Sequence, residues 1–168
     1  MDQLRAAVIG VGNMGRHHVR ILGSMPDIDL AGIVDVDVDR AAPHAESART
    51  RVFRSLAELP SVDLAIVAVP TEHHLDTSLA LIERGVHLLV EKPLASTPAE
   101  AERIVEAAEK SGVTLAVGHV ERFNAAVNVL ANLVEDPVML SFERLSPFTP
   151  RIRDSVVFDL MVHDLDLA

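Results

Sequence analysis

The stretch Ala6–Gly15, with the sequence AAVIGVGNMG, leads a short apolar run directly into three glycines spaced as G-x-G-x-x-G. Its first four residues have the length and composition of a buried strand, and helical spacing begins at Met14. A strand that passes through this glycine pattern into a helix is the context in which the pattern binds a dinucleotide. The free N–H groups at the start of that helix would face the phosphates.

Each glycine would have a separate role in such a loop. Gly10 would permit a tight turn, Gly12 would let a pyrophosphate approach the backbone, and Gly15 would let the helix pack closely against the strand. A plain tight turn is the alternative explanation. The predicted cofactor-binding residues of the loop are Gly10, Gly12, Asn13, Met14 and Gly15.

A carboxylate follows the second apolar run, Leu30–Val34. Asp35 lies 20 residues after Gly15, which is the separation at which an acid binds the ribose hydroxyls of NAD. The same charge would repel the 2′-phosphate of NADP, whereas Arg40 is a nearby cation that would attract it. The sequence therefore predicts NAD in preference to NADP, with an ordinary surface aspartate as the alternative explanation of Asp35.

Apolar runs and amphipathic stretches alternate over most of the chain, which predicts an α/β fold with a doubly wound parallel sheet, a Rossmann domain. Gly23, Gly85 and Gly112 lie just past predicted helix ends and are expected in the left-handed conformation. The run Thr97–Glu100 predicts a capping box. The predicted strands are Ala6–Ile9, Leu30–Val34, Leu64–Val69, His87–Val90 and Thr114–Val117, and the predicted helices are Met14–Leu22, Asp39–Ala48, His74–Arg84 and Pro98–Lys110.

The pattern changes near residue 119. Asn124–Leu133 and Val156–Ala168 have helical spacing, Val138–Arg144 alternates like a strand, and Ser146–Pro150 reads as a proline-rich loop. We expect residues 1–120 to form the dinucleotide-binding domain and a further segment to begin at residue 121. Because the last predicted helix stops without a cap, we expect that the chain is cut short or that another element normally continues it.

The composition describes an acidic chain with an aliphatic core. Hydrophobic residues make up 49% of the 168, with five Phe and no Tyr or Trp, which suits buried parallel strands. A formal net charge of −10 without a Lys/Arg cluster argues against a nucleic-acid partner. The lack of cysteine excludes thiolate metal sites, and adjacent histidines point to different sides of a helix, so no metal is expected. No apolar run is long enough to cross a membrane, and we expect a cytoplasmic protein.

Two further segments carry groups suited to proton transfer. Lys92 follows the predicted strand His87–Val90, at the edge where ligands bind in open α/β sheets, although a lysine after a strand is most often solvated. On the last apolar stretch, Asp159, His163 and Asp166 stand at positions i, i+4 and i+7. A carboxylate one turn from an imidazole can orient it as a general base, or can simply stabilise a helix.

The segments GVGNMG, VEKP and DLMVHDLD together resemble the Gfo/Idh/MocA family of NAD(P)-dependent oxidoreductases, over essentially the whole chain. The resemblance implies a Rossmann domain followed by a C-terminal α/β substrate domain, which residues 121–168 would begin and which would be largely missing from this chain. When complete, that domain completes the substrate site and forms a homo-oligomer. It also implies that Lys92 polarises the substrate oxygen and that His163 is the acid/base, with Asp159 as its partner. By the same resemblance Pro70, Thr71, His74 and Glu91 would line the nicotinamide side of the cofactor, and His119 and Arg122 would contact the substrate.

The substrate is expected to be a sugar or nucleotide sugar. The segment Arg144–Asp154 resembles the one that precedes the catalytic helix in family members that oxidise C3 of UDP-N-acetylglucosamine-type substrates. Its Arg151 and Arg153 could meet substrate anions. The alternative is a proline-braced loop whose arginines pair with surrounding carboxylates, and inositols or hexoses stay open as substrates.

These features predict an NAD-dependent dehydrogenase that transfers a hydride between a sugar hydroxyl carbon and nicotinamide. The main alternative is a non-catalytic dinucleotide-binding module, because a chain without most of the second domain would bind cofactor and lack turnover. A methyltransferase that uses S-adenosylmethionine is a third hypothesis, which EKP and D-x-x-x-H disfavour.

Overall fold

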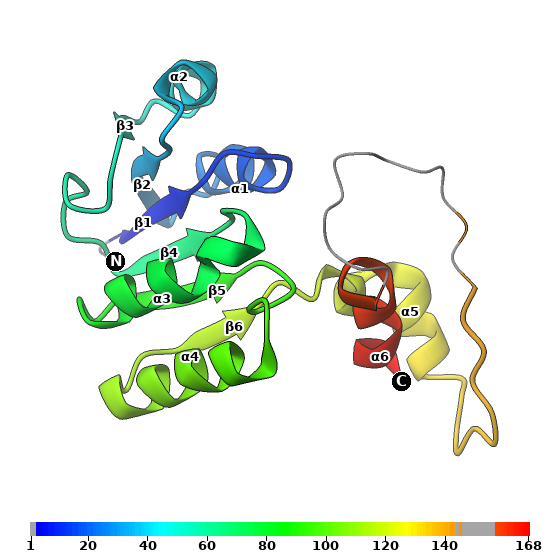
Figure 1. Ribbon diagram of the computed structural model, residues 1–168. Helices are drawn as coiled ribbons and strands as arrows, with labels where there is room; N and C mark the ends of the chain where they lie inside the picture. The colour runs from blue at the N-terminus through cyan, green and yellow to red at the C-terminus, as the bar shows by residue number, and fades with distance from the viewer. Residues whose placement is uncertain (1–2, 144, 146–156) are drawn as a thin grey trace. The chain divides into compact units, whose positions relative to one another are not determined.

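The computed structural model describes residues 3–143, 145 and 157–168 (Figure 1). The chain divides into two compact units, Met1–Val117 and Gly118–Ala168, which we call the first and the second unit. Each unit is described by itself below.

The first unit contains a six-stranded parallel sheet with the order β3-β2-β1-β4-β5-β6. The strand order reverses between β1 and β4, and ligands bind outside the carboxyl ends of the strands at such a switch point. The prediction of a doubly wound parallel sheet is therefore confirmed. The strands are β1 Leu4–Ile9, β2 Ile28–Val34, β3 Val52–Phe53, β4 Leu64–Val67, β5 His87–Val90 and β6 Leu115–Val117.

Helices cover both faces of the sheet, and alternate residues of β1 belong to different cores. Ala6 and Val8 pack with residues of α1 and α2, whereas Ala7 and Ile9 share a cluster with residues of α3 and α4. A fully buried aliphatic side chain in either core contributes about 1.5–3 kcal/mol relative to an exposed one. The helices are α1 Gly15–Leu22, α2 Val38–Ser47, α3 His74–Ile82 and α4 Pro98–Ser111, with a short 3₁₀ helix, η1, at Thr71–His73.

Local signals fix some of the helix ends. Thr97 and Glu100 form the predicted capping box at the start of α4, and Gly85 and Gly112 have the expected positive φ. The prediction for Gly23 is wrong, because its φ is −65°. Helical hydrogen bonding simply continues there, with the Gly23 N–H donating to the carbonyl of Val19.

The second unit contains only short helices among its described residues. They are η2 Val120–Phe123, α5 Ala125–Ala131, a π-helical turn η3 at Val157–Met161 and α6 Val162–Leu167. The helix predicted over Val156–Ala168 is present over its described residues, but it begins with a π-helical turn. The i, i+4 spacing of Asp159 and His163 therefore does not lie on one continuous α-helix.

The predicted strand at Val138–Arg144 is also wrong over its described residues, 138–143, which form no strand. Val138 and Met139 are highly exposed there. A strand requires a neighbour to share its hydrogen bonds, and no described segment provides one. The loop Ser146–Pro150 and the arginines Arg151 and Arg153 lie outside the described residues.

No helix in the described part of the chain combines the length and the apolar composition needed to cross a bilayer.

Candidate cofactor site and proton-transfer residues

Four loops of the first unit meet at the carboxyl edge of the sheet. Backbone hydrogen bonds tie each loop to its neighbour: Gly10 N–H to the Val34 carbonyl at 2.7 Å, and Ala68 N–H to Ile9 at 2.8 Å. The Glu91 N–H donates to the Val67 carbonyl at 2.9 Å. The residues that follow β1, β2, β4 and β5 are therefore neighbours in space, as the sequence predicted for the glycine loop and Asp35.

The glycine loop fits a dinucleotide. Gly10 has a φ of +88°, and a Cβ on Gly15 would lie 1.8 Å from the carbonyl oxygen of Gly10, so neither position accepts a side chain. A Cβ on Gly12 would meet nothing within 4 Å. That open space beside the exposed backbone is what a pyrophosphate needs. Asn13 and Met14 are exposed on the same turn.

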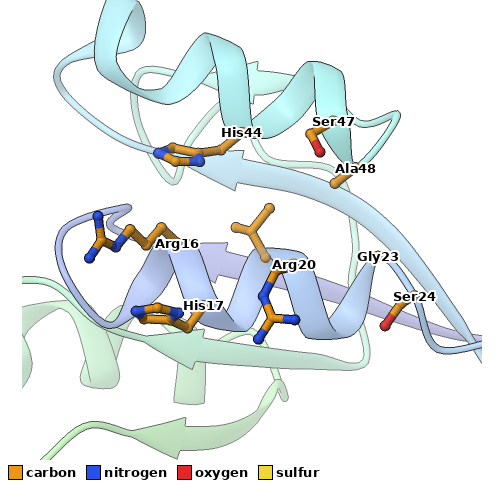
Figure 2. A pocket seen from close by; sticks show the side chains of 9 residues that line it. Arg16, His17, Arg20, Gly23, Ser24, His44, Ser47 and Ala48 are labelled. Carbon is orange, nitrogen blue, oxygen red and sulfur yellow. The ribbon is translucent and has the colours of Figure 1, made fainter.

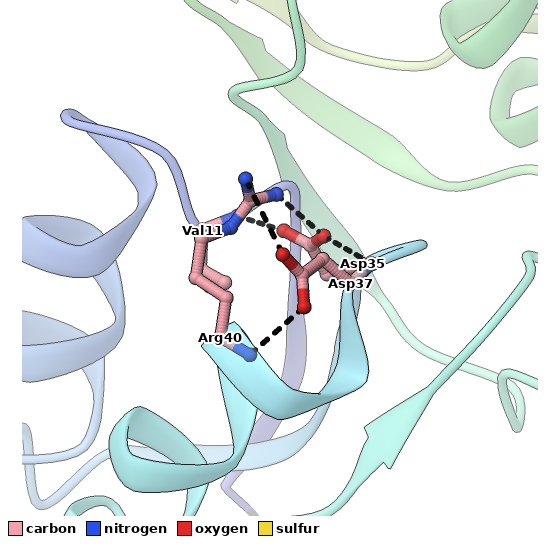
Figure 3. A network of polar contacts seen from close by, with 4 residues as sticks. All are labelled: Val11, Asp35, Asp37 and Arg40. Atoms are coloured by element: carbon pink, nitrogen blue, oxygen red, sulfur yellow. Dashed lines mark hydrogen bonds and ion pairs between the residues drawn. The ribbon is translucent and has the colours of Figure 1, made fainter.

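Asp35 is buried, and both of its oxygens accept hydrogen bonds (Figure 3). Oδ2 accepts from the Val11 N–H at 2.8 Å, and Oδ1 accepts from the Asp37 N–H at 2.9 Å and from Nη2 of Arg40 at 2.7 Å. A carboxylate has about four acceptor positions. Three of them are used, and one stays available for a ribose hydroxyl.

Glu91 has a partner that the sequence did not suggest. Its Oε1 lies 2.6 Å from Nε2 of His18, and the two side chains are only 9% and 15% exposed. His18 lies three residues after Gly15 and directly before Val19, both of which are buried. Because His18 is a polar residue next to the buried positions of α1, its need for a hydrogen-bond partner was the sequence signal that could have predicted this contact.

His74, predicted to line the cofactor, lies inside the first unit. Its side chain is 1% exposed, with Nδ1 at 3.0 Å from the Pro93 carbonyl and Nε2 at 2.9 Å from the Val69 carbonyl. It therefore joins the loop after β4 to the turn after β5. Pro70 is exposed in that loop, and Thr71 and Lys92 are half-buried.

In the second unit, the carboxylate of Asp166 contacts the side chains of Arg122 and His119. Arg122 donates three hydrogen bonds of 2.7–2.9 Å to its two oxygens, and Nδ1 of His119 lies 3.5 Å from Oδ1. The Arg122 hydrogen bonds hold the pKa of Asp166 below its usual value; burial opposes this effect, and the charges of His119 and His163 add to it. The same contact raises the pKa of Arg122. The predicted residues His119 and Arg122 thus share one carboxylate, and the charge of His163 acts on the pKa of the same group.

For Asp159 only the backbone is described, so its pairing with His163 stays a prediction. Lys92 belongs to the first unit and His163 to the second, and their meeting at one substrate also stays a prediction.

A hollow of about 460 Å³ lies between α1 and α2 (Figure 2). Its lining includes Arg16, His17, Arg20 and His44, but not Gly12, Asp35 or Glu91, so it is separate from the cofactor site. Among the described residues, no group of three or more His, Asp or Glu could hold a metal ion.

Residues 4–119 match the family model described as an oxidoreductase family with an NAD-binding Rossmann fold. The chain is thus a member of a class of nicotinamide-dependent oxidoreductases with this fold. It belongs to the Gfo/Idh/MocA family.

Several curated relatives are named as dehydrogenases of a nucleotide sugar or an inositol. UDP-N-acetylglucosamine 3-dehydrogenase of Acidithiobacillus ferrooxidans is 38% identical over 100% of this chain and 54% of its own length. Inositol 2-dehydrogenase of an Arthrobacter species is 32% identical over 98% of this chain and 53% of its own. The chain spans about half the length of the curated relatives it matches.

Solved structures show the same fold. A crystal form of the Acidithiobacillus enzyme superposes with a TM-score of 0.91 at 38% identity, covering 99% of this chain and 56% of that one. GenD2 from gentamicin A biosynthesis, solved in complex with NAD, has a TM-score of 0.87 at 28% identity and covers 99% and 53%.

Proposed function

We propose that this chain supplies the cofactor-binding part of an NAD-dependent dehydrogenase that oxidises a hydroxyl-bearing carbon of a sugar or nucleotide sugar. The observation that carries the proposal is the hydrogen bond between the Val11 N–H and Asp35. It fixes an acid with spare acceptor capacity beside the open backbone of Gly12, as NAD binding requires. The 38% identity to a UDP-N-acetylglucosamine 3-dehydrogenase supports a nucleotide sugar as substrate.

NAD is proposed in preference to NADP. The buried Asp35 carboxylate would accept a hydrogen bond from a ribose hydroxyl and would repel a 2′-phosphate. Arg40 works in the opposite direction, because its half-exposed guanidinium lies at 2.7 Å from Asp35. The arrangement favours NAD and leaves a cation within reach of a phosphate.

The chemical roles follow the position of each group and the family resemblance. Bound NAD supplies the hydride acceptor. Lys92, at the carboxyl edge of the sheet, would hold the substrate oxygen with its ammonium group. His163 would take the hydroxyl proton as general base, with Asp159 orienting the ring. His119 and Arg122, and the arginines Arg151 and Arg153, are proposed to bind the substrate.

The domain assignment is part of the same proposal. Residues 1–120 would bind the cofactor, and residues 121–168 would begin the domain that completes the substrate site and makes the homo-oligomer. A cytoplasmic location fits such an enzyme.

Two measurements test the proposal. Calorimetry of the 168-residue chain with NAD and NADP should show NAD binding, and its absence would overturn the cofactor assignment. A chimera, in which the remaining part of the Acidithiobacillus enzyme follows Ala168, is then assayed for reduced nicotinamide with UDP-N-acetylglucosamine, inositols and hexoses. Turnover is expected with the nucleotide sugar. NAD binding with no turnover on any substrate would favour the non-catalytic module.

A further inference from the structure

Two histidines, the half-buried His18 and the buried His74, contact the turn Glu91–Pro93 on either side of Lys92. On one side, Nε2 of His18 in α1 lies 2.6 Å from Oε1 of Glu91. On the other, Nδ1 of His74 in α3 lies 3.0 Å from the carbonyl oxygen of Pro93. The residues before and after Lys92 are therefore each held by an imidazole from a different helix, on opposite faces of the sheet.

The surroundings of His74 specify its protonation. Both of its ring nitrogens lie within hydrogen-bond distance of backbone carbonyl oxygens, those of Pro93 and Val69. A carbonyl oxygen only accepts, and a neutral imidazole has a single N–H to donate. In either neutral tautomer one ring lone pair would face a carbonyl lone pair, and a side chain 1% exposed leaves no room for water to separate them. Only the imidazolium satisfies both contacts.

We propose that His18 and His74 are positioning residues for Lys92, and that His74 acts as an imidazolium that donates from both ring nitrogens. The role of Lys92 itself rests on the function proposed above. Through its second contact, His74 also fixes the carbonyl of Val69, directly before Pro70 and Thr71. One buried cation would thus set the turn that carries Lys92 and the loop predicted to line the nicotinamide.

The two hydrogen bonds lower the cost of burying this cation. Charge-assisted hydrogen bonds are stronger than neutral ones and offset part of the cost of burial. The titratable groups on the turn and at the start of α3 are Glu91, Lys92, Glu72, His73 and Asp76, together with His18 of α1. Glu91 is the buried carboxylate among them and contacts His18, whereas the ammonium group of Lys92 has the same sign of charge as an imidazolium.

Isosteric variants test the two ring nitrogens of each histidine one at a time. The amide nitrogen of Asn takes the place of Nδ1, and that of Gln takes the place of Nε2. His74→Asn therefore keeps the donor to Pro93, and His74→Gln keeps only the donor to Val69. At His18 the order is reversed, because Nε2 contacts Glu91: His18→Gln keeps the contact and His18→Asn loses it. His73→Asn, at an exposed neighbour, is the matched control.

Lys92 can be followed separately from the rest of the chain. The protein has only two lysines, and the second, Lys110, is 77% exposed and provides an internal reference. An amine-reactive label, quantified by mass spectrometry, measures the accessibility of Lys92 relative to Lys110. We expect the Lys92 labelling rate to rise several-fold in His74→Gln and His18→Asn, and to stay near that of the unmodified chain in His74→Asn, His18→Gln and His73→Asn.

Heteronuclear NMR of the imidazole nitrogens in the unmodified 168-residue chain tests the charge directly. At neutral pH His74 should show two protonated ring nitrogens. A singly protonated His74 would overturn the imidazolium, and equal labelling in the Asn and Gln variants would overturn the positioning roles. If a His74 variant fails to fold, the ring-nitrogen spectrum of the unmodified chain still tests the imidazolium. The two His18 variants still test the positioning role. Neither readout uses turnover, so a failure of the proposed enzymatic function would appear separately, as absent NAD binding or absent activity.

Discussion

The backbone N–H of Val11 donates a 2.8 Å hydrogen bond to Oδ2 of Asp35, 24 residues further along the chain. The bond connects the loop predicted to hold the pyrophosphate to the acid predicted to hold the ribose. Asp35 is therefore both a structural acceptor for the glycine loop and the proposed ligand of the adenosine half of NAD.

Asp35→Ala should weaken NAD binding and destabilise the first unit. It removes the acceptor of the Val11 N–H, and a buried donor without a partner costs about 1–3 kcal/mol. Calorimetry with NAD and thermal unfolding measure the two effects. Asp39→Ala, an exposed neighbour on α2, should change neither; equal effects in both variants would contradict the role of Asp35.

Arg40→Ala should shift cofactor preference further toward NAD. The guanidinium at 2.7 Å from Asp35 is the group available to a 2′-phosphate. Its loss should lower the affinity for NADP by about tenfold, which is roughly 1.4 kcal/mol, with a smaller change for NAD. Parallel titrations with the two cofactors give the ratio, and a ratio that stays constant would remove Arg40 from cofactor selection.

Gly12→Ala should lower the affinity for NAD, whereas Gly15→Ala should lower the stability of the fold. A Cβ at position 12 meets nothing within 4 Å, so the melting temperature should hold while NAD affinity falls. A Cβ at position 15 would lie 1.8 Å from the Gly10 carbonyl oxygen, and such overpacking costs about 1–3 kcal/mol or more. Thermal unfolding and calorimetry on both variants test this pair; full NAD affinity in Gly12→Ala would show that no phosphate approaches that position.

The Arg122–Asp166 contact should be lost in acid. Because the folded pKa of Asp166 is lowered from 3.8, its stabilising effect is complete above that pH and disappears as the pH falls through the lower folded value. A carboxyl NMR titration follows Asp166 directly. Arg122→Ala should return the pKa toward its ordinary value, whereas Arg103→Ala, in the first unit, should leave it unchanged; no return in Arg122→Ala would mean that another group causes the shift.

Local patterns were enough to predict most of the fold. Short buried runs flanked by helices predicted five of the parallel strands, because burial on both faces imposes a recognisable apolar composition. The strand β3 was missed because Val52 and Phe53, between Arg51 and Arg54, are too few residues to show a period. The strand expected from Val138 failed for the opposite reason: its alternation is present, but the described residues provide no neighbouring strand.

The candidate site could be predicted only where its residues are close together in the sequence or follow a known spacing. The glycine loop and Asp35 follow from spacing along the chain. The contacts of His18 with Glu91, and of Arg122 with Asp166, span 73 and 44 residues and depend on tertiary packing that no local pattern encodes. The contacts of His74 with the carbonyls of Pro93 and Val69 come from the same packing, and its place beside the cofactor stays a prediction.

A crystal structure of the 168-residue chain with NAD tests the central claim most directly. We expect the pyrophosphate beside Gly12 and a hydroxyl of the adenosine ribose within hydrogen-bond distance of Asp35. Adenosine bound instead in the hollow between α1 and α2, against Arg16 and Arg20, would contradict the account.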